Sequence, residues 1–254
     1  MKILINADDF GLSPGKNEAI DLGMRQGFLH RTSLIVNSAY AEQASVLAKL
    51  GGYADRVCFH LNLAEGMAMS KELQETDLVG ENGQLKSLRN RELLLKGFSS
   101  ARVNALRAEC AAQMKRFREL GFFSRHIDSH KWSMCSIPTW TAIEPLLQDF
   151  GFESTRTLEG HRLSTCGSAM RLSYRLVFGK MKKILRVEEN WSGCGSELST
   201  ALYSGMIGKD HRIELYVHPD MRNGIPTDML FTYKGEEKPL TEIYEQAKQW
   251  DERI

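Results

Sequence analysis

The alternation of short strand-like runs with longer helical stretches is the feature that most constrains how this chain can fold. The runs that are rich in branched apolar residues, and so predict strands, are 2–6, 32–38, 56–62, 125–129, 151–155, 185–190 and 212–218. The stretches that predict helices are 15–26, 40–50, 101–120, 139–150, 168–183, 196–208 and 240–253. Repeated strand–helix units indicate a mainly parallel sheet. With about seven units in 254 residues, we expect a single α/β domain over 1–254, an irregular (β/α) barrel; an open doubly wound sheet is the alternative.

A long insertion separates the third predicted strand from helix 101–120. Segment 64–100 is rich in glycine, serine and charged residues and contains at most one short predicted helix, near 89–97. Loops of this length in compact domains are usually functional. We therefore expect this loop to serve as a lid or a binding wall.

Composition excludes several classes of protein. The formal net charge of +1 gives no reason to expect a nucleic-acid partner. No apolar stretch approaches the ~20 residues that cross a bilayer, and the chain starts with a strand-like run instead of a secretory signal. The five cysteines are scattered and include no CxxC pair, which is typical of reduced thiols. We expect a cytoplasmic location.

Polar residues follow the ends of the predicted strands. In a parallel α/β fold these ends gather on one rim, where active sites are built. We expect the polar residues at or near these ends to meet there: Asp8, Asp9, Asn37, His60, Asn62, His126, Asp128, His130, Arg156 and His218.

The residue types expected at this rim suggest a metal site. His60, His126 and one carboxylate of Asp8–Asp9 form a two-histidine, one-carboxylate set that suits Zn²⁺, Fe²⁺, Co²⁺, Ni²⁺ or Mn²⁺. The second aspartate would then act as a general base on a water molecule. For each residue taken alone, the simpler reading is a turn or helix cap for the aspartates and a structural hydrogen bond for each histidine.

Two further residues fit the same rim. His218 ends the last predicted strand of the rim, and its ordinary pKa near 6.5 suits a general acid; a capping histidine is the alternative. Arg156 can pair with the base and orient it, or it can be a surface arginine.

Two other segments carry weaker functional signals. Segment 171–186 carries six Lys and Arg residues interleaved with apolar ones; it can contact anionic lipid, phosphate or nucleic acid, although a packed helix with a solvated basic face is the commoner case. The glycines of 192–197 are not followed by a GK[ST] sequence. They do not predict a phosphate loop.

Several motifs together resemble the YdjC-like carbohydrate deacetylases. They are "ILINADDFGLSPGKNEAI", "RTSLIVNS", "FHLNL", "HIDSH" and "VHPD", and they span residues 3 to 220 in the family's order. The resemblance implies an irregular (β/α) barrel and the metal-dependent removal of an acetyl group from an N-acetylated sugar.

The resemblance also implies a role for each matching residue. Asp9, His60 and His126 would bind a divalent metal, with Zn²⁺ expected first and Mg²⁺, Co²⁺, Ni²⁺ or Mn²⁺ as alternatives. Asp8 would be the catalytic base and His218 the general acid. Arg156 would match the arginine that lies near the base.

One motif departs from the family pattern. Family members commonly continue the fourth-strand motif as HxDxHHH, whereas here Lys131 and Trp132 replace the later histidines. Trp132 can stack on a sugar ring and Lys131 can bind an anionic group; the alternative is that either side chain simply packs against the protein. We expect the substrate site to include five residues: Asn37, Asn62, His130, Lys131 and Trp132. The departure suggests a sugar other than diacetylchitobiose.

The sequence thus predicts a metal-dependent deacetylase that acts on N-acetylated sugars and that can form a homodimer. Two rival readings remain open. The chain can be a sugar-binding protein without catalytic activity, or a metal-dependent hydrolase of another amide or ester bond.

Overall fold

The structure is a computed structural model that describes residues 2–86, 99–159, 168–231 and 236–253. Its principal strands are β1 (Ile3–Phe10), β2 (Arg31–Leu34), β3 (Val57–Leu61), β4 (His126–Ser129), β5 (Ser154–Thr155), β6 (Arg186–Val187), β7 (Trp191–Gly193) and β8 (Ile213–Val217). Its helices are α1 (Pro14–Arg25), α2 (Ala41–Leu50), α3 (Lys71–Gln74), α5 (Ser100–Glu119), α6 (Ile137–Ile143), α7 (Ser168–Ile184), α8 (Gly195–Tyr203) and α9 (Leu240–Asp251), with 3₁₀ turns η1 (Ala54–Arg56), η2 (His130–Cys135) and η3 (Glu144–Leu146). In the part of the chain that is described, no helix is both long and apolar enough to cross a membrane.

Eight strands form one parallel, curled sheet. Their order is β6-β5-β4-β3-β2-β1-β8-β7, and each neighbouring pair is parallel. Within the described ranges the edge strands β6 and β7 do not pair, so the curled sheet is an open half-barrel and not a closed barrel. The expected α/β class, with its mainly parallel sheet and irregular barrel, is confirmed.

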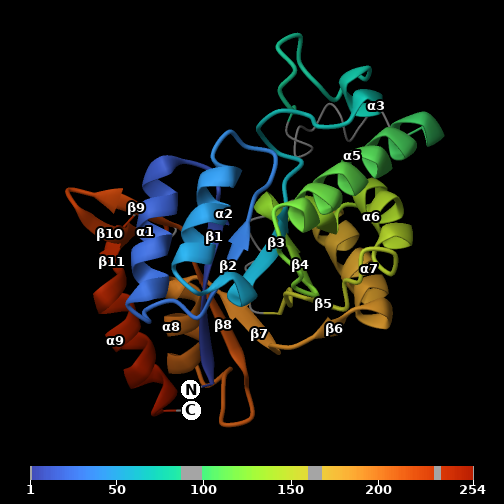
Figure 1. Ribbon diagram of the computed structural model, residues 1–254. Helices are drawn as coiled ribbons and strands as arrows, with labels where there is room; N and C mark the ends of the chain where they lie inside the picture. The colour runs from blue at the N-terminus through green and yellow to red at the C-terminus, as the bar shows by residue number, and fades with distance from the viewer. Residues whose placement is uncertain (1, 87–98, 160–167, 232–235, 254) are drawn as a thin grey trace.

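The helices lie around the outside of this sheet, with α1 and α9 on one side and α5, α6 and α7 on the other (Figure 1). Helix 101–120 was predicted closely, because its apolar spacing places buried Leu106, Cys110 and Met114 on one face. Helix 139–150 is shorter than predicted. It ends at Ile143, and η3 follows across Pro145, whose ring has no N–H to continue a helix.

A small antiparallel sheet was not predicted. Strands β9 (Pro219–Arg222), β10 (Ile225–Asp228) and β11 (Lys238–Pro239) pair in the order β11-β10-β9, and β9 and β10 contact α1. The strands are short and contain prolines, so their sequence lacks a clear two-residue alternation. This sheet follows His218 directly and packs beside the rim of the half-barrel.

The two faces of β1 differ in chemistry. Ile3, Ile5 and Ala7 are buried in the hydrophobic core, whereas Asn6 and Asp8 are buried on the other face and hydrogen-bond to each other. Because side chains alternate along a strand, the concave side of this sheet is polar, and it leads to the rim.

The insertion after β3 is partly ordered where the structure describes it. Residues 64–86 contain α3 and two isolated bridges, Met67 to Gln84 and Val79 to Leu85. The helix predicted near 89–97 lies outside the described residues.

Candidate metal and catalytic site

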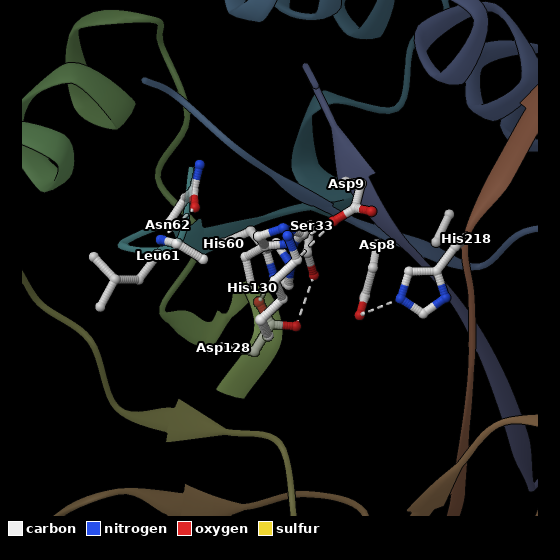
Figure 2. Close-up of polar contacts among 12 residues, drawn as sticks. Asp8, Asp9, Ser33, His60, Leu61, Asn62, Asp128, His130 and His218 are labelled. Carbon is white, nitrogen blue, oxygen red and sulfur yellow. Dashed lines mark hydrogen bonds and ion pairs between the residues drawn. The ribbon is translucent and has the colours of Figure 1, made fainter. Parts of the chain in front are cut away.

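A bulge at the end of β1 presents both aspartates to the rim. The register with β2 shifts between Ala7 and Phe10, and Asp9 has a φ of 70°. In a regular strand Asp8 and Asp9 would face opposite sides of the sheet; the left-handed conformation, which aspartate tolerates better than most residues, removes that alternation. Figure 2 shows Asp9 turned toward His60 and His130, with Asp8 on the side of His218.

Asp9, His60 and His130 bring three metal-ligand atoms together. Asp9 Oδ1 lies 2.7 Å from His130 Nδ1 and 3.6 Å from His60 Nε2, and the three residues are buried with their ligand atoms within 4.8 Å of one another. Neither contact has the geometry of a hydrogen bond, so within the described chain this buried oxygen has no hydrogen-bond partner. Two imidazole nitrogens and a carboxylate oxygen are a donor set that suits a divalent transition metal. The residues present therefore fit a metal ion.

The charge balance of this cluster agrees with that fit. Burial disfavours a charge on His60, but Asp128 and Asp9 outweigh it and raise the pKa of His60 to about 10. Burial likewise disfavours ionised Asp9, yet contacts with His130 and His60 hold its pKa well below the usual value. Contact with Asp9 and Glu65 outweighs burial and raises the pKa of His130. Without a metal, the carboxylates thus draw protons onto the histidines, and a bound cation would take the place of that positive charge.

A carboxylate behind His60 fixes the orientation of its ring. Asp128 Oδ1 lies 2.6 Å from His60 Nδ1, and Ser33 Oγ donates to Asp128 Oδ2 at 2.9 Å. This arrangement leaves His60 Nε2 directed at Asp9. A carboxylate paired with the far nitrogen of a ligand histidine is a common feature of metal sites.

Arg156 holds Asp8 through two hydrogen bonds. Its Nη1 donates to Asp8 Oδ2 at 2.8 Å and its Nη2 to Asp8 Oδ1 at 2.6 Å, while its Nε donates to buried Glu214 at 3.0 Å. Asn6 also donates to Asp8 Oδ1, at 2.7 Å. Burial opposes the charge on Arg156, but Asp8, Glu214 and Asp128 outweigh it and raise the pKa of the guanidinium well above its usual value. The carboxylate of Asp8 is thereby fixed in direction.

His218 lies on the other side of Asp8. Its Nε2 is 3.9 Å from Asp8 Oδ2, and its backbone N–H donates to Asp228 Oδ1 at 2.8 Å. It follows the last residue of β8 directly. Asp8 therefore lies between Arg156 and a histidine that is positioned to exchange a proton at the rim.

The predicted position of His126 is wrong. β4 begins at His126, so this residue lies at the start of its strand instead of at the C-terminal end. Its Nδ1 is 3.1 Å from Ser154 Oγ, and its side chain lines a hollow of about 480 Å³ with Arg31 and Cys58. The structure does not bring His126 to Asp9 and His60; His130, which we expected to contact substrate, takes that place.

The side chains of Asn37 and Asn62 hydrogen-bond to each other and to backbone carbonyls of the insertion. Asn62 Nδ2 donates to Asn37 Oδ1 at 2.9 Å and to the Glu65 carbonyl at 2.8 Å, and Asn37 Nδ2 is 3.3 Å from the Met67 carbonyl. They fix the start of the insertion beside the site.

Lys131 and Trp132 form a turn at the edge of the site. Both residues adopt left-handed backbone angles, with φ of 51° and 58°. The Lys131 ammonium pairs with Glu65, and the Trp132 ring packs edge-on against Tyr216 with centroids 6.4 Å apart. Both therefore border the rim, and their contact with a substrate stays a prediction.

Sequence reasoning missed three charged residues. Glu65 Oε1 accepts from His130 Nε2 at 2.7 Å, Lys16 Nζ lies 3.3 Å from Asp9 Oδ2, and Glu214 joins Arg156 to Arg31. The only available signal was for Glu214, a charged residue inside the otherwise apolar run 213–217.

The fold and this cluster define a (β/α) half-barrel protein with a carboxylate–histidine site able to hold a divalent metal. A family model described as "YdjC-like protein" matches residues 2–249. The chain belongs to the YdjC-like family.

Curated proteins that resemble this chain in sequence include carbohydrate deacetylases. A Danio rerio carbohydrate deacetylase is 32% identical over 158 residues, which cover 61% of this chain and 49% of the relative. A Listeria monocytogenes carbohydrate deacetylase is 31% identical over 147 residues, 58% of this chain and 54% of the relative. The chain thus spans about half the length of the curated relatives it matches.

A solved structure shares the fold over nearly the whole chain. An Enterococcus faecalis protein, described as a candidate for cellobiose-phosphate cleavage, superimposes with a TM-score of 0.68 at 16% sequence identity. The match covers 98% of this chain and 93% of that protein. At this identity the likeness supports the architecture alone.

Proposed function

We propose that this protein is a metal-dependent hydrolase that removes an N-acetyl group from an N-acetylated sugar or oligosaccharide, releasing acetate. The observation that carries the proposal is the convergence of Asp9, His60 and His130 beside the Arg156-bound carboxylate of Asp8. The carbohydrate deacetylases among its relatives support the substrate class.

In this proposal Asp9, His60 and His130 hold the metal. A divalent ion in this position supplies Lewis-acid activation of the acetyl carbonyl and of a water molecule. Zinc suits the donor set best, and cobalt, nickel, manganese and magnesium are the alternatives to test. The position of His126 at the far end of β4 argues against it as the third ligand.

The remaining residues move and hold protons. Asp8 takes the proton of the attacking water, and Arg156 keeps its carboxylate directed at that water. His218 gives a proton to the departing amine nitrogen, so that the free amino sugar can leave. Lys131 and Trp132 border the rim and would contact the sugar.

The buried cysteines favour a reducing compartment. Cys58, Cys110, Cys135 and Cys194 are buried and free. Burial raises the pKa of the Cys58 thiol to about 11 and that of Cys135 to about 12, which makes them poor nucleophiles. We therefore assign them to packing and propose a cytoplasmic enzyme.

An acetate-release assay tests the function. The protein is stripped with a chelator and incubated with N-acetylated mono- and oligosaccharides, with and without each of the five metals. We expect acetate and a free amine in equal amounts, and only when metal is restored.

The same assay separates the rival readings. Sugar binding without acetate release in any combination would support a non-catalytic sugar-binding protein. Hydrolysis of simple amides or esters by a protein inert toward acetylated sugars would support a different hydrolase.

A further inference from the structure

Helix α7 has one face that the packing of the protein explains. Tyr174, Val177, Phe178 and Met181 are buried at spacings of three and four residues, so they form the stripe by which α7 packs onto the rest of the chain. Met181 also lines a small hollow together with Asp128, Trp132 and Arg156. The inner side of α7 is therefore close to the candidate site, while its outer side is separate from it.

The outer face carries apolar side chains that this packing does not explain. Leu172 is 59% exposed, Leu176 is 53% exposed and Ile184 is 48% exposed. Leu172 and Leu176 are four residues apart and so lie on the same face, one turn from each other. Single exposed leucines are common on protein surfaces. Two neighbouring leucines in the middle of a solvent-facing helix surface instead indicate a site that binds a partner.

The same face is strongly basic. Arg175, Lys180, Lys182 and Lys183 are exposed around the two leucines, and residues 168–187 contain six Lys and Arg residues and no Asp or Glu. Of these exposed residues, Arg175, Lys180 and Lys183 form no salt bridge with any residue that the structure describes. The whole chain carries a net charge of only +1, so this positive charge is local to one helix.

We propose that the outer face of α7 docks the protein on an anionic lipid bilayer. Clusters of four to eight Lys and Arg residues on an amphipathic helix are suited to acidic lipid headgroups, and leucines between them can enter the headgroup layer. An anionic bilayer matches both features of the face. Its phosphates attract the basic side chains, and the leucines can be buried at the boundary between headgroups and acyl chains. Figure 1 shows α7 on the outside of the half-barrel, on the side opposite α1 and α9. The proposal does not depend on the chemistry of the candidate site.

Vesicle binding tests the proposal with the full chain. The probe is a set of phosphatidylcholine vesicles, with and without a third of phosphatidylglycerol, in a co-sedimentation assay. We expect binding to the anionic vesicles alone, weakened as NaCl rises from ~0.1 M to ~0.5 M because salt screens surface charges.

A charge-reversed variant tests the face itself. Arg175→Glu, Lys180→Glu and Lys183→Glu together should weaken binding by more than about fiftyfold, because each basic side chain at an anionic surface strengthens binding about fivefold. Leu172→Ser with Leu176→Ser should weaken it less and leave the salt dependence in place. The matched control reverses three exposed lysines on other helices, Lys71, Lys115 and Lys248, with the same change in net charge.

Several results would overturn the proposal. They are equal binding to neutral and anionic vesicles, an equal loss in the control variant, and a charge-reversed α7 that binds like the wild type. Binding of the wild type to a nucleic-acid duplex but not to vesicles would also overturn it, as would an α7 variant that changes only the oligomeric state. Circular dichroism of each variant separates loss of the face from loss of the fold.

Discussion

Arg156 donates a hydrogen bond to each carboxylate oxygen of Asp8, with donor–acceptor distances of 2.8 and 2.6 Å, although the two residues are 148 positions apart in the sequence. The same guanidinium donates to Glu214 through its third nitrogen at 3.0 Å. One planar cation thus fixes the direction of the carboxylate that we propose as the base. A lysine cannot make these three directed contacts at once.

Arg156→Lys should therefore lower kcat more than it raises KM. The charge is kept, but Asp8 loses its fixed direction, and a misplacement of about 1 Å can cost ~10²-fold in rate. Steady-state kinetics of acetate release measure the two constants separately. A variant with the wild-type kcat would show that Arg156 has only a structural role.

Asp8→Asn should lower turnover by roughly 10²–10⁴-fold, because the amide cannot accept the proton of the attacking water. Metal content, measured by atomic emission after dialysis, should stay at the wild-type level. Asp55→Asn, on η1 at the opposite end of the sheet, is the matched control. Loss of metal in the Asp8 variant would reverse the assignments of Asp8 and Asp9.

His130→Ala should weaken metal binding by more than the ~10–100-fold that the loss of an outer-sphere partner costs, because it removes a ligand. His126→Asn should leave metal affinity within about threefold of the wild type. Calorimetric titration of each stripped protein with Zn²⁺ measures both. If His126→Asn weakened metal binding strongly and His130→Ala did not, His126 would be the third ligand instead of His130.

Asp128→Asn and Glu65→Gln should each weaken metal binding by roughly 10–100-fold, since each carboxylate orients a ligand histidine. The Asp128 substitution should weaken metal binding more, because Asp128 is buried behind His60 whereas Glu65 is only half-buried. The same titration tests this order. Equal affinity in all three proteins would remove both carboxylates from the site.

His30 should make the stripped protein less stable below neutral pH. Its Nδ1 accepts a hydrogen bond from the Ile5 N–H at 3.0 Å, and burial, assisted by Arg56, lowers its pKa. A histidine with a lowered folded pKa contributes stability that is present above its unfolded pKa of about 6.5 and is lost as pH falls below that value.

Urea unfolding at pH values from 5 to 8 measures this effect. One such proton changes the free energy of unfolding by at most ~1.4 kcal/mol per pH unit. His30→Asn, which keeps an acceptor for Ile5, should reduce the slope below pH 6.5 and leave a constant difference from the wild type at higher pH. An unchanged slope would exclude His30 as the source.

The sequence by itself determined the strand–helix alternation and the kinds of residue at the rim. These follow from local periodicity, since the apolar spacing in α5 or the strand-like run of β1 fixes which side chains can be buried together. The parallel sheet follows in turn, because a helix between successive strands returns the chain to the same end.

The tertiary structure decided which of these residues meet. His126 and His130 belong to one five-residue motif, yet they are four extended steps apart, roughly 13 Å, because His126 begins β4 and His130 follows its last residue. Only His130 lies beside Asp9. The bulge that turns Asp9 toward the histidines, and the Glu214 that supports Arg156, depend on pairing with strands far away in sequence. Periodicity specifies the face of an element, whereas the position along it at which a contact forms depends on the register between strands.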